Sequence, residues 1–158
     1  MNYDTIIGYL PNPLEDTCLK KLGTKLKEDL NILGNYYYPD QNIVKTVKLG
    51  NFRIASTEYP CLKLYRYTDT YNKDNNIRYS RIKLTYGTIY DVAVHNVGLL
   101  NFISEAINVI LIDYLKNEMK FSNSKIAFIE ETTEYPIQLG DNYATEYQLI
   151  TRFITILN

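Results

Sequence analysis

The stretch CLKLYRY at residues 61–67, followed after a polar gap by IRYSRIKLTYGTIY at residues 77–90, decides the fold. Apolar and polar side chains alternate in both segments, so that Leu62 and Leu64 share one face of the first and Ile82 and Leu84 share one face of the second. This period of two predicts two strands of a half-buried sheet, paired antiparallel. The gap between them, residues 68–76, is rich in turn formers and lacks apolar periodicity, so we expect a long exposed hairpin loop there.

Two amphipathic helices are expected on either side of this hairpin. Asn12-Pro13-Leu14-Glu15 combines an N-cap, a proline at the first helical position and a capping glutamate, which predicts a helix from Asn12 to Gly34. The residues Tyr36 to Asp40 form a connecting loop in this interpretation, because Pro39 cannot continue the helix. A second helix is expected over residues 96–117. Its apolar face is broad enough for part of it to contact either a partner subunit or a second layer of packing in the same chain.

The remaining strands complete the predicted architecture. Residues 43–49 and 52–56 are apolar runs of strand length, and Gly50-Asn51 between them is a hairpin-turn signal. Two final strands are expected at residues 125–132 and 143–157, the second with apolar residues on both faces. The order predicts a single α+β domain over residues 1–158, in which a mainly antiparallel or mixed sheet packs against two amphipathic helices and carries a long β-hairpin loop.

Charge is unevenly distributed along the 158 residues. The formal net charge is −1, but residues 1–60 are neutral, residues 61–90 carry +4 and residues 91–158 carry −5. The near-neutral total argues against a protein that coats nucleic acid with a basic surface. Segregated charge suits head-to-tail self-association, in which a basic face of one copy meets an acidic face of the next. Solvated faces that happen to differ explain the pattern equally well.

The sequence contains no recognisable catalytic or cofactor signature. His95 is the single histidine and has no partner at ligand or triad spacing, and the seven glycines form no phosphate-binding loop. Cys18 and Cys61 are expected to be buried thiols, not a disulfide or a zinc site. The acidic run with Glu130 and Glu131 reads as a solvated strand end in preference to a metal site. We therefore expect no enzyme activity, no metal and no cofactor. No stretch is long and apolar enough to predict a membrane span, and no signal peptide is expected.

Several segments in order resemble a known family. They are the leading helix, the strand entry Glu58-Tyr59-Pro60, the strand SRIKLTY at residues 80–86, the helix from Val97 to Leu115, and the terminal strand YQLITRFI at residues 147–154. Together they resemble the tail terminator, or tail completion, proteins of long-tailed bacteriophages and contractile injection particles. The resemblance covers nearly the whole chain.

The resemblance implies a structural virion protein at the head–tail junction, assembled in the host cytoplasm. It implies a homo-oligomeric ring, expected to be hexameric, that caps the end of the tail tube, stops tail polymerisation and joins the tail to the head. The implied partners are the tail tube protein, the neck or head completion protein and, in a contractile tail, the terminal sheath ring. Genomic DNA would pass through the lumen without specific binding, and no membrane would be contacted.

The candidate surface for contacts between subunits or between rings combines two charged regions of the sequence. The residues of this surface are Asp69, Tyr71, Lys73, Asp74, Arg78, Arg81, Lys83, Glu130, Glu131 and Glu134. A head completion or neck adaptor protein between portal and tail would have the same composition. A small monomeric protein that binds a host target belongs to a different class and is also compatible with the sequence, and a hydrolase without a recognised motif is the least favoured reading.

Overall fold

The computed structural model describes residues 1–9, 18–51, 54–74, 77–89, 95–122, 124–139 and 146–157. Three helices, six strands and a 3-10 turn have described bounds within these ranges. They are α1 (Tyr3–Tyr9), α2 (Cys18–Asn35), β1 (Thr46–Leu49), η1 (Ser56–Glu58), β2 (Cys61–Asn72), β3 (Ile77–Ile89), α4 (Val97–Lys116), β4 (Lys120–Phe121), β5 (Ser124–Leu139) and β6 (Glu146–Leu157).

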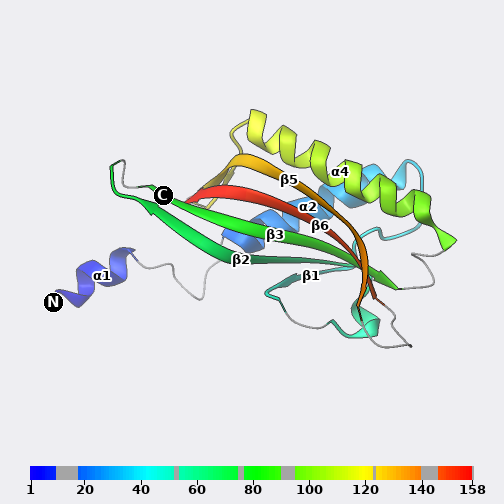
Figure 1. Cartoon of the computed structure of the whole chain (residues 1–158), viewed down its shortest axis with the longest axis horizontal. Coiled ribbons are helices and arrows are strands. Elements are labelled where there is room, and N and C mark those ends of the chain that lie inside the picture. The colour runs from blue at the N-terminus through cyan, green and yellow to red at the C-terminus, as the bar shows by residue number, and fades with distance from the viewer. Residues whose placement is uncertain are drawn as a thin grey trace.

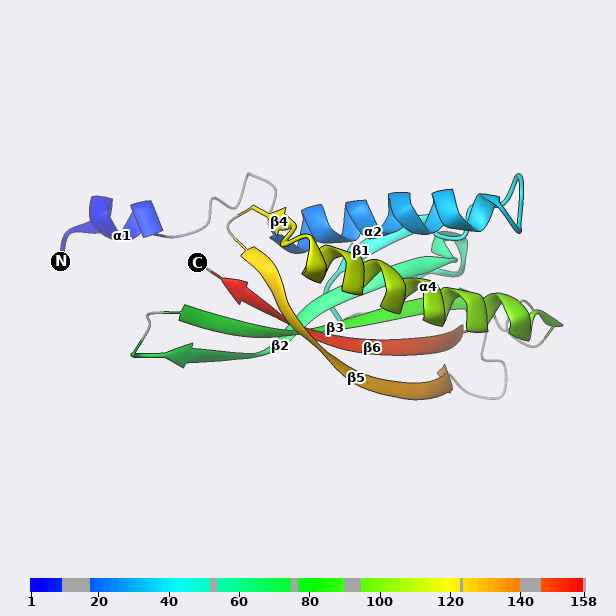
Figure 2. The same ribbon diagram turned by 90° about the horizontal axis from the view of Figure 1, so that it is seen from above.

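All six strands form one sheet in the order β1-β2-β3-β6-β5-β4. Only β1 runs parallel to its neighbour, β2; the other pairs are antiparallel. Both long helices cover the same face of the sheet, and the strands are strongly twisted beneath them (Figures 1 and 2). The expected α+β class, with a mixed sheet against two amphipathic helices, is confirmed.

The core lies between this helix layer and the sheet. On β2 and β3, Leu62, Leu64, Ile82 and Leu84 are fully buried, as their alternation predicts. From the helices, the buried side chains are Cys18, Leu22, Leu26 and Leu30 of α2, and Leu99, Leu100, Ile103, Ala106, Ile107, Ile110, Leu111 and Tyr114 of α4. Cys18, Leu22, Leu26 and Leu30 recur every four residues, so they lie on one side of α2, and that side faces the sheet.

Polar contacts fix the two helices to each other and to the chain beside them. The Tyr114 hydroxyl on α4 donates a hydrogen bond to Asp29 Oδ2 on α2 at 2.5 Å, and Lys25 contacts the other oxygen of the same carboxylate at 2.9 Å. The amide of Asn31 bonds both the N–H and the carbonyl of Val44, at 2.9 and 3.0 Å. These bonds hold the chain after α2 close against the helix.

Both predicted helices are present with small changes in their bounds. The predicted start at Asn12 lies outside the described residues, and α2 extends one residue beyond Gly34. The segment from Tyr36 to Asp40 is a loop, as expected. For α4, Asn96 is the N-cap, and its side-chain oxygen accepts a hydrogen bond from the Leu99 N–H at 3.1 Å.

The prediction for residues 43–56 is wrong in two respects. Among the described residues of this stretch, the strand is confined to Thr46–Leu49, and it pairs with β2 in parallel instead of forming a hairpin across Gly50-Asn51. In the described part of the expected strand 52–56, Ile54 and Ala55 are not in a strand, and η1 begins at Ser56. The physical reason is burial: Ile54 packs with Tyr59 and Cys61 in a small second cluster instead of joining a ladder.

The expected long loop at residues 68–76 is also mostly wrong. β2 continues to Asn72, which pairs with Ile77, so the connection is only four residues long. Cross-strand hydrogen bonds therefore carry the hairpin well past the last core residue. Further elements were not anticipated: α1, the two-residue strand β4, and the length of β5, which runs to Leu139.

Candidate interaction surface

The tip of the β2–β3 hairpin extends beyond the helix layer (Figures 1 and 2). β6 pairs with β3 as far as Arg78↔Leu157, so among the described residues only the end of the hairpin is two-stranded. Its ladder is regular from Thr68↔Arg81 to Asn72↔Ile77, with one register shift between Arg66 and Thr68. A shift of this kind increases local twist and turns the outer half of a hairpin relative to the inner half. The outer half of the hairpin is therefore a continuation of the sheet, and it still contains a fully buried residue, Ser80, opposite Asp69.

The tip of the hairpin brings several predicted contact residues together. Tyr71, Lys73 and Asp74 are exposed, and the Asp74 N–H donates a hydrogen bond to Asn72 Oδ1 at 3.0 Å, which tightens the turn. Asp69 and Arg78 lie on the same part of the ladder, where Asp69 pairs with Ser80 and Arg78 with Tyr71. Their backbone positions are described; their side chains are not.

The structure joins two of the predicted residues to each other. Arg81 on β3 and Glu130 on β5 form an ion pair across the intervening strand β6, with Nη2 to Oε1 at 3.1 Å and Nε to both oxygens at 3.2 Å. Sequence reasoning assigned these two side chains to separate charged regions and did not foresee their contact, since they are 49 residues apart. Both remain partly exposed.

The other predicted residues lie on the same strands. Lys83 is half-buried and sits in register between Tyr65 of β2 and Arg152 of β6. Glu131 and Glu134 lie on β5, and Glu134 pairs with Ile150; only their backbone is described. The candidate set thus divides into a hairpin-tip group, the Arg81–Glu130 pair with its neighbour Lys83, and two glutamates on β5.

Both sides of the sheet leave a stretch of strand without a described neighbour. β1 pairs with β2 only from Cys61 to Leu64, so within the described residues no strand lies outside Arg66–Thr70. On the other side, β4 covers only Ser124 and Lys125 of β5, so in the described chain the outer side of β5 carries no strand from Ile126 onward. Unpaired N–H and C=O groups at a sheet edge are ready to pair with another chain.

The two open edges run in opposite directions. β2 is antiparallel to β3, β3 is antiparallel to β6, and β6 is antiparallel to β5, so β2 and β5 point opposite ways. β5 is also irregular: its register shifts near residues 127, 131–133 and 135–136, and Pro136 lacks an N–H. Such features restrict how an edge can be paired.

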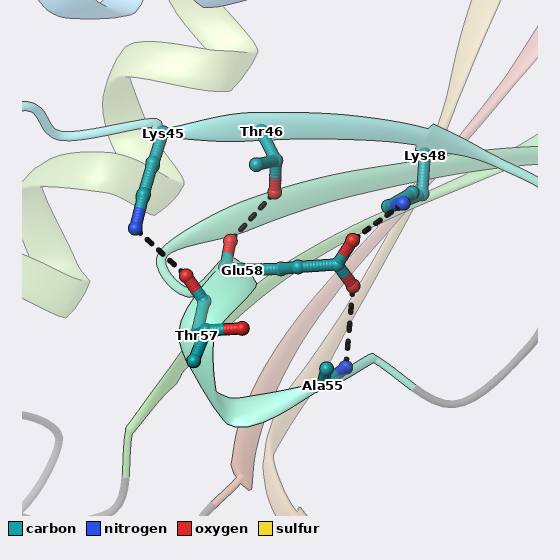
Figure 3. Close-up of polar contacts among 6 residues, drawn as sticks. All are labelled: Lys45, Thr46, Lys48, Ala55, Thr57 and Glu58. Atoms are coloured by element: carbon teal, nitrogen blue, oxygen red, sulfur yellow. Dashed lines mark hydrogen bonds and ion pairs between the residues drawn. The ribbon is translucent and has the colours of Figure 1, made fainter.

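A compact set of contacts holds the end of β1 against η1 (Figure 3). Lys45 Nζ donates to the Thr57 carbonyl at 2.7 Å, and Thr46 Oγ1 donates to the Glu58 carbonyl at 2.6 Å. The Glu58 carboxylate accepts from Lys48 at 2.5 Å and from the Ala55 N–H at 3.2 Å (Figure 3). These two donors lower the pKa of Glu58. These contacts hold residues 55–58, which lead into Tyr59 and Cys61, in a fixed position beside β1.

The described residues contain no cluster of three or more histidine, cysteine, aspartate or glutamate side chains that could hold a metal ion. Cys18 and Cys61 are buried thiols that form no disulfide with any described residue, and burial raises the pKa of the Cys18 thiol. His95 is exposed.

Among the described helices, α4 alone is long and apolar enough to cross a membrane. Eight of its residues are buried against the sheet and α2, which is the arrangement of a core helix.

The sequence matches no known protein family, and no curated protein matches it.

Proposed function

We propose that this chain is a ring-forming structural protein, the terminator of a phage-type tail, which caps the end of the tail tube and joins it to the head. The observation that carries the proposal is the pair of open sheet edges, β2 at Arg66–Thr70 and β5 beyond Ile126, which run in opposite directions. A ring needs two different, complementary surfaces on each copy, and these edges have that character.

Strand direction supports a head-to-tail contact. A second copy placed beside the first in the same orientation brings its β5 edge next to the β2 edge of the first. Because β2 and β5 are antiparallel, this contact continues the alternation already present across β2, β3, β6 and β5. The same contact then repeats from copy to copy. It produces a closed ring when the rotation between copies divides a full turn, and six copies is the number that the family resemblance implies.

The charge distribution favours the same pairing. The hairpin region, residues 61–90, carries +4, and residues 91–158 carry −5. Glu130, Glu131 and Glu134 follow one another along the outer strand β5. Opposite charges on the two mating sides favour the head-to-tail contact and disfavour hairpin-to-hairpin pairing between copies. The effect would weaken with salt, since the Debye length is about 8 Å at physiological ionic strength.

The irregular β5 edge can support one limited contact with a neighbouring copy. Register shifts and Pro136 divide the part of β5 beyond β4 into short regular stretches, at Phe128–Glu130 and Ile137–Leu139, that are available for pairing. An edge of this kind does not template indefinite sheet growth. In a terminator, the closed ring binds to the last ring of the tail tube. It offers no edge equivalent to that of a tube ring, so no further tube ring can be added and elongation stops. The projecting hairpin is the element we assign to the contact with the tube.

The proposal is tested by adding the purified protein to polymerising tail tube protein and measuring tube length. We expect elongation to stop and one ring to appear at tube ends by electron microscopy. A variant with a hairpin shortened by two register pairs, lacking Tyr71, Asn72, Ile77 and Arg78, is expected to keep its fold and to lose capping. Its matched control is Val109→Ser, an exposed substitution on α4 that leaves the hairpin intact.

Other outcomes would point elsewhere. A ring that ignores the tube but binds a portal-side protein would make the chain a neck adaptor. A monomer that never assembles and leaves tube length unchanged would overturn the proposal and favour a small binding protein.

A further inference from the structure

The short strands β1 and β4 cover the two edges of the sheet at different levels. β3 pairs with β2 and, through β6, with β5, so positions on all four long strands can be compared along β3. β1 covers the part of β2 that is level with residues 84–87 of β3. β4 covers the part of β5 that is level with Arg78 and Tyr79. Among the described residues, β2 is therefore open toward the hairpin tip, and β5 is open toward its other end, at Leu139.

Two copies placed side by side without displacement cannot pair these open edges. β5 continues to Leu139, which is level with Ile89, so it would meet β1 of the neighbouring copy. β4 would in turn meet the outer end of β2 at Thr70 and Tyr71. Paired strands are only about 4.8 Å apart, which leaves no room for a third strand between them. The edges fit when one copy is displaced along the strands toward the hairpin tip of the other.

The end of β5 sets the size of this displacement. Leu139 must pass β1, and the first residue of β2 beyond β1 is Tyr65, which is level with Lys83 of β3. From Ile89, level with Leu139, to Lys83 is six residues along β3, or about 20 Å at ~3.4 Å per residue. The number must be even, because a slip by one residue exchanges the two faces of a sheet. Six is therefore the smallest displacement that clears β1 and keeps the helices of both copies on the same face.

We propose that neighbouring copies are displaced by six residues along the strands, so that residues 65–72 of β2 in one copy pair antiparallel with residues 130–139 of β5 in the next. That these two edges join copies rests on the proposed function; β1 and β4 act as stops that fix the register. In this register Thr70 of one copy lies opposite Glu134 of the next. A larger even displacement would also clear both stops, but it would shorten the contact.

This register joins the separate parts of the candidate interaction surface. Asn72 lies opposite Glu130 of the next copy, and the exposed Lys73 follows at the tip. Glu131 and Glu134 lie on the same stretch of β5. A basic residue of the tip thus comes close to an acidic strand of another copy, which favours this contact. Within one chain, β3 and β6 keep the two groups apart.

The displacement is compatible with a closed ring. The four long strands of each copy span about 19 Å at ~4.8 Å per strand. A displacement of about 20 Å over this width corresponds to strands inclined by about 45° to the ring axis. Strands of closed barrels are inclined by roughly 35–45°, so the copies can stay level around the ring although their strands are displaced.

Disulfide trapping tests the register, because the natural cysteines Cys18 and Cys61 are buried. Two single variants, Thr70→Cys and Glu134→Cys, are mixed and oxidised, and the covalent products are measured by mass and peptide mapping. We expect a covalent dimer joined between positions 70 and 134, which neither variant forms alone. The link can form only between copies, because β3 and β6 separate the two positions within one chain.

Two further pairs of variants serve as controls. Asn72→Cys mixed with Glu130→Cys tests the same displacement at other positions and is expected to give the corresponding dimer. Arg66→Cys mixed with Ile129→Cys tests copies that are not displaced, since both positions are level with the same residue of β3. The second pair is expected to stay reduced, because a displacement of six residues moves the two positions too far apart for a disulfide.

A link between positions 66 and 129 without the other two would overturn the displacement. The absence of all three links, in variants whose circular dichroism matches that of the original chain, would overturn the contact itself. Copies that are linked between positions 70 and 134 but fail to cap tubes would refute the proposed function and leave the register intact. Capping by a protein that gives neither expected link would do the reverse.

Discussion

The inner and outer halves of the β2–β3 hairpin share the same two strands and one hydrogen-bonded ladder, yet their surroundings differ. In the inner half, Leu64 and Leu84 pair with each other and are fully buried beneath the helices. In the outer half, Thr70 and Tyr71 are exposed, and the described buried residue is the polar Ser80 opposite Asp69, not an apolar side chain. The comparison separates two parts of one element: the inner half stabilises the fold, and the outer half is the part that we propose to contact another molecule.

The largest effect is expected in the inner half. Leu64→Ala leaves a cavity in a fully buried site and should lower the free energy of unfolding by about 2–5 kcal/mol. Chemical denaturation measures this loss. Tyr71→Ala in the outer half is the matched control and should change stability by less than about 0.5 kcal/mol. Equal losses in the two variants would contradict the division of the hairpin.

A second expected effect concerns the packing that keeps α2 on the inner half. At Gly34, a Cβ would meet the side chain of Ile43, which is buried in the same core. Gly34→Ala should therefore cost about 1–3 kcal/mol through overpacking. Thermal denaturation detects the change. Ile43→Ala removes the Cγ1 and Cδ1 atoms nearest to the added Cβ, so the double variant Gly34→Ala/Ile43→Ala should lose less stability than the sum of the two single variants. A neutral Gly34→Ala would show that the loop after α2 adjusts freely.

A third effect should appear at alkaline pH. Burial raises the pKa of Tyr86 and of Tyr114, and the hydrogen bond to Asp29 raises the pKa of Tyr114 further. A raised folded-state pKa gives stability that is fully present below pH about 10 and is lost as pH rises above it, because only the unfolded chain then ionises readily.

Tyr114→Phe tests this account. It should cost about 1–2 kcal/mol at neutral pH through the lost hydrogen bond. Between pH 10 and 12 the variant should lose less stability than the original chain. If the free energies of unfolding of the two proteins fall in parallel over this range, Tyr114 does not have the role described.

The smallest effect is expected on the uncovered side of the sheet. Arg81 and Glu130 are partly exposed, so their ion pair should contribute no more than about 1 kcal/mol to folding. A double-mutant cycle with Arg81→Met and Glu130→Gln measures the coupling. A coupling free energy several times larger than this would mean that the ion pair stabilises the fold as strongly as the buried residues of the inner half do.

The sequence predicts the inner half of the hairpin and both long helices because periodic apolar residues report burial directly. It does not predict the outer half: residues 68–72 lack apolar alternation, so their strand is maintained by the ladder to β3 alone. The parallel pairing of β1 was missed because Gly50-Asn51 is a local hairpin signal, whereas the observed partner is β2.

The candidate surface was predictable only in part. The tip residues Lys73 and Asp74 follow from local composition, since a polar turn is exposed wherever it occurs. The Arg81–Glu130 pair depends on the order β3-β6-β5, which no local pattern encodes. α1 was missed because its apolar face is three residues wide and has no partner among the described parts of its own chain.

In our proposal, the β2 edge at Arg66–Thr70 and the β5 edge beyond Ile126 join copies head to tail into one closed ring. The most direct test is the mass of the purified protein in solution over a range of protein and salt concentrations. We expect a single closed oligomer, a hexamer, that is in equilibrium with monomer and is weakened by salt. A monomer at every concentration, or an open series of ever larger oligomers, would contradict it.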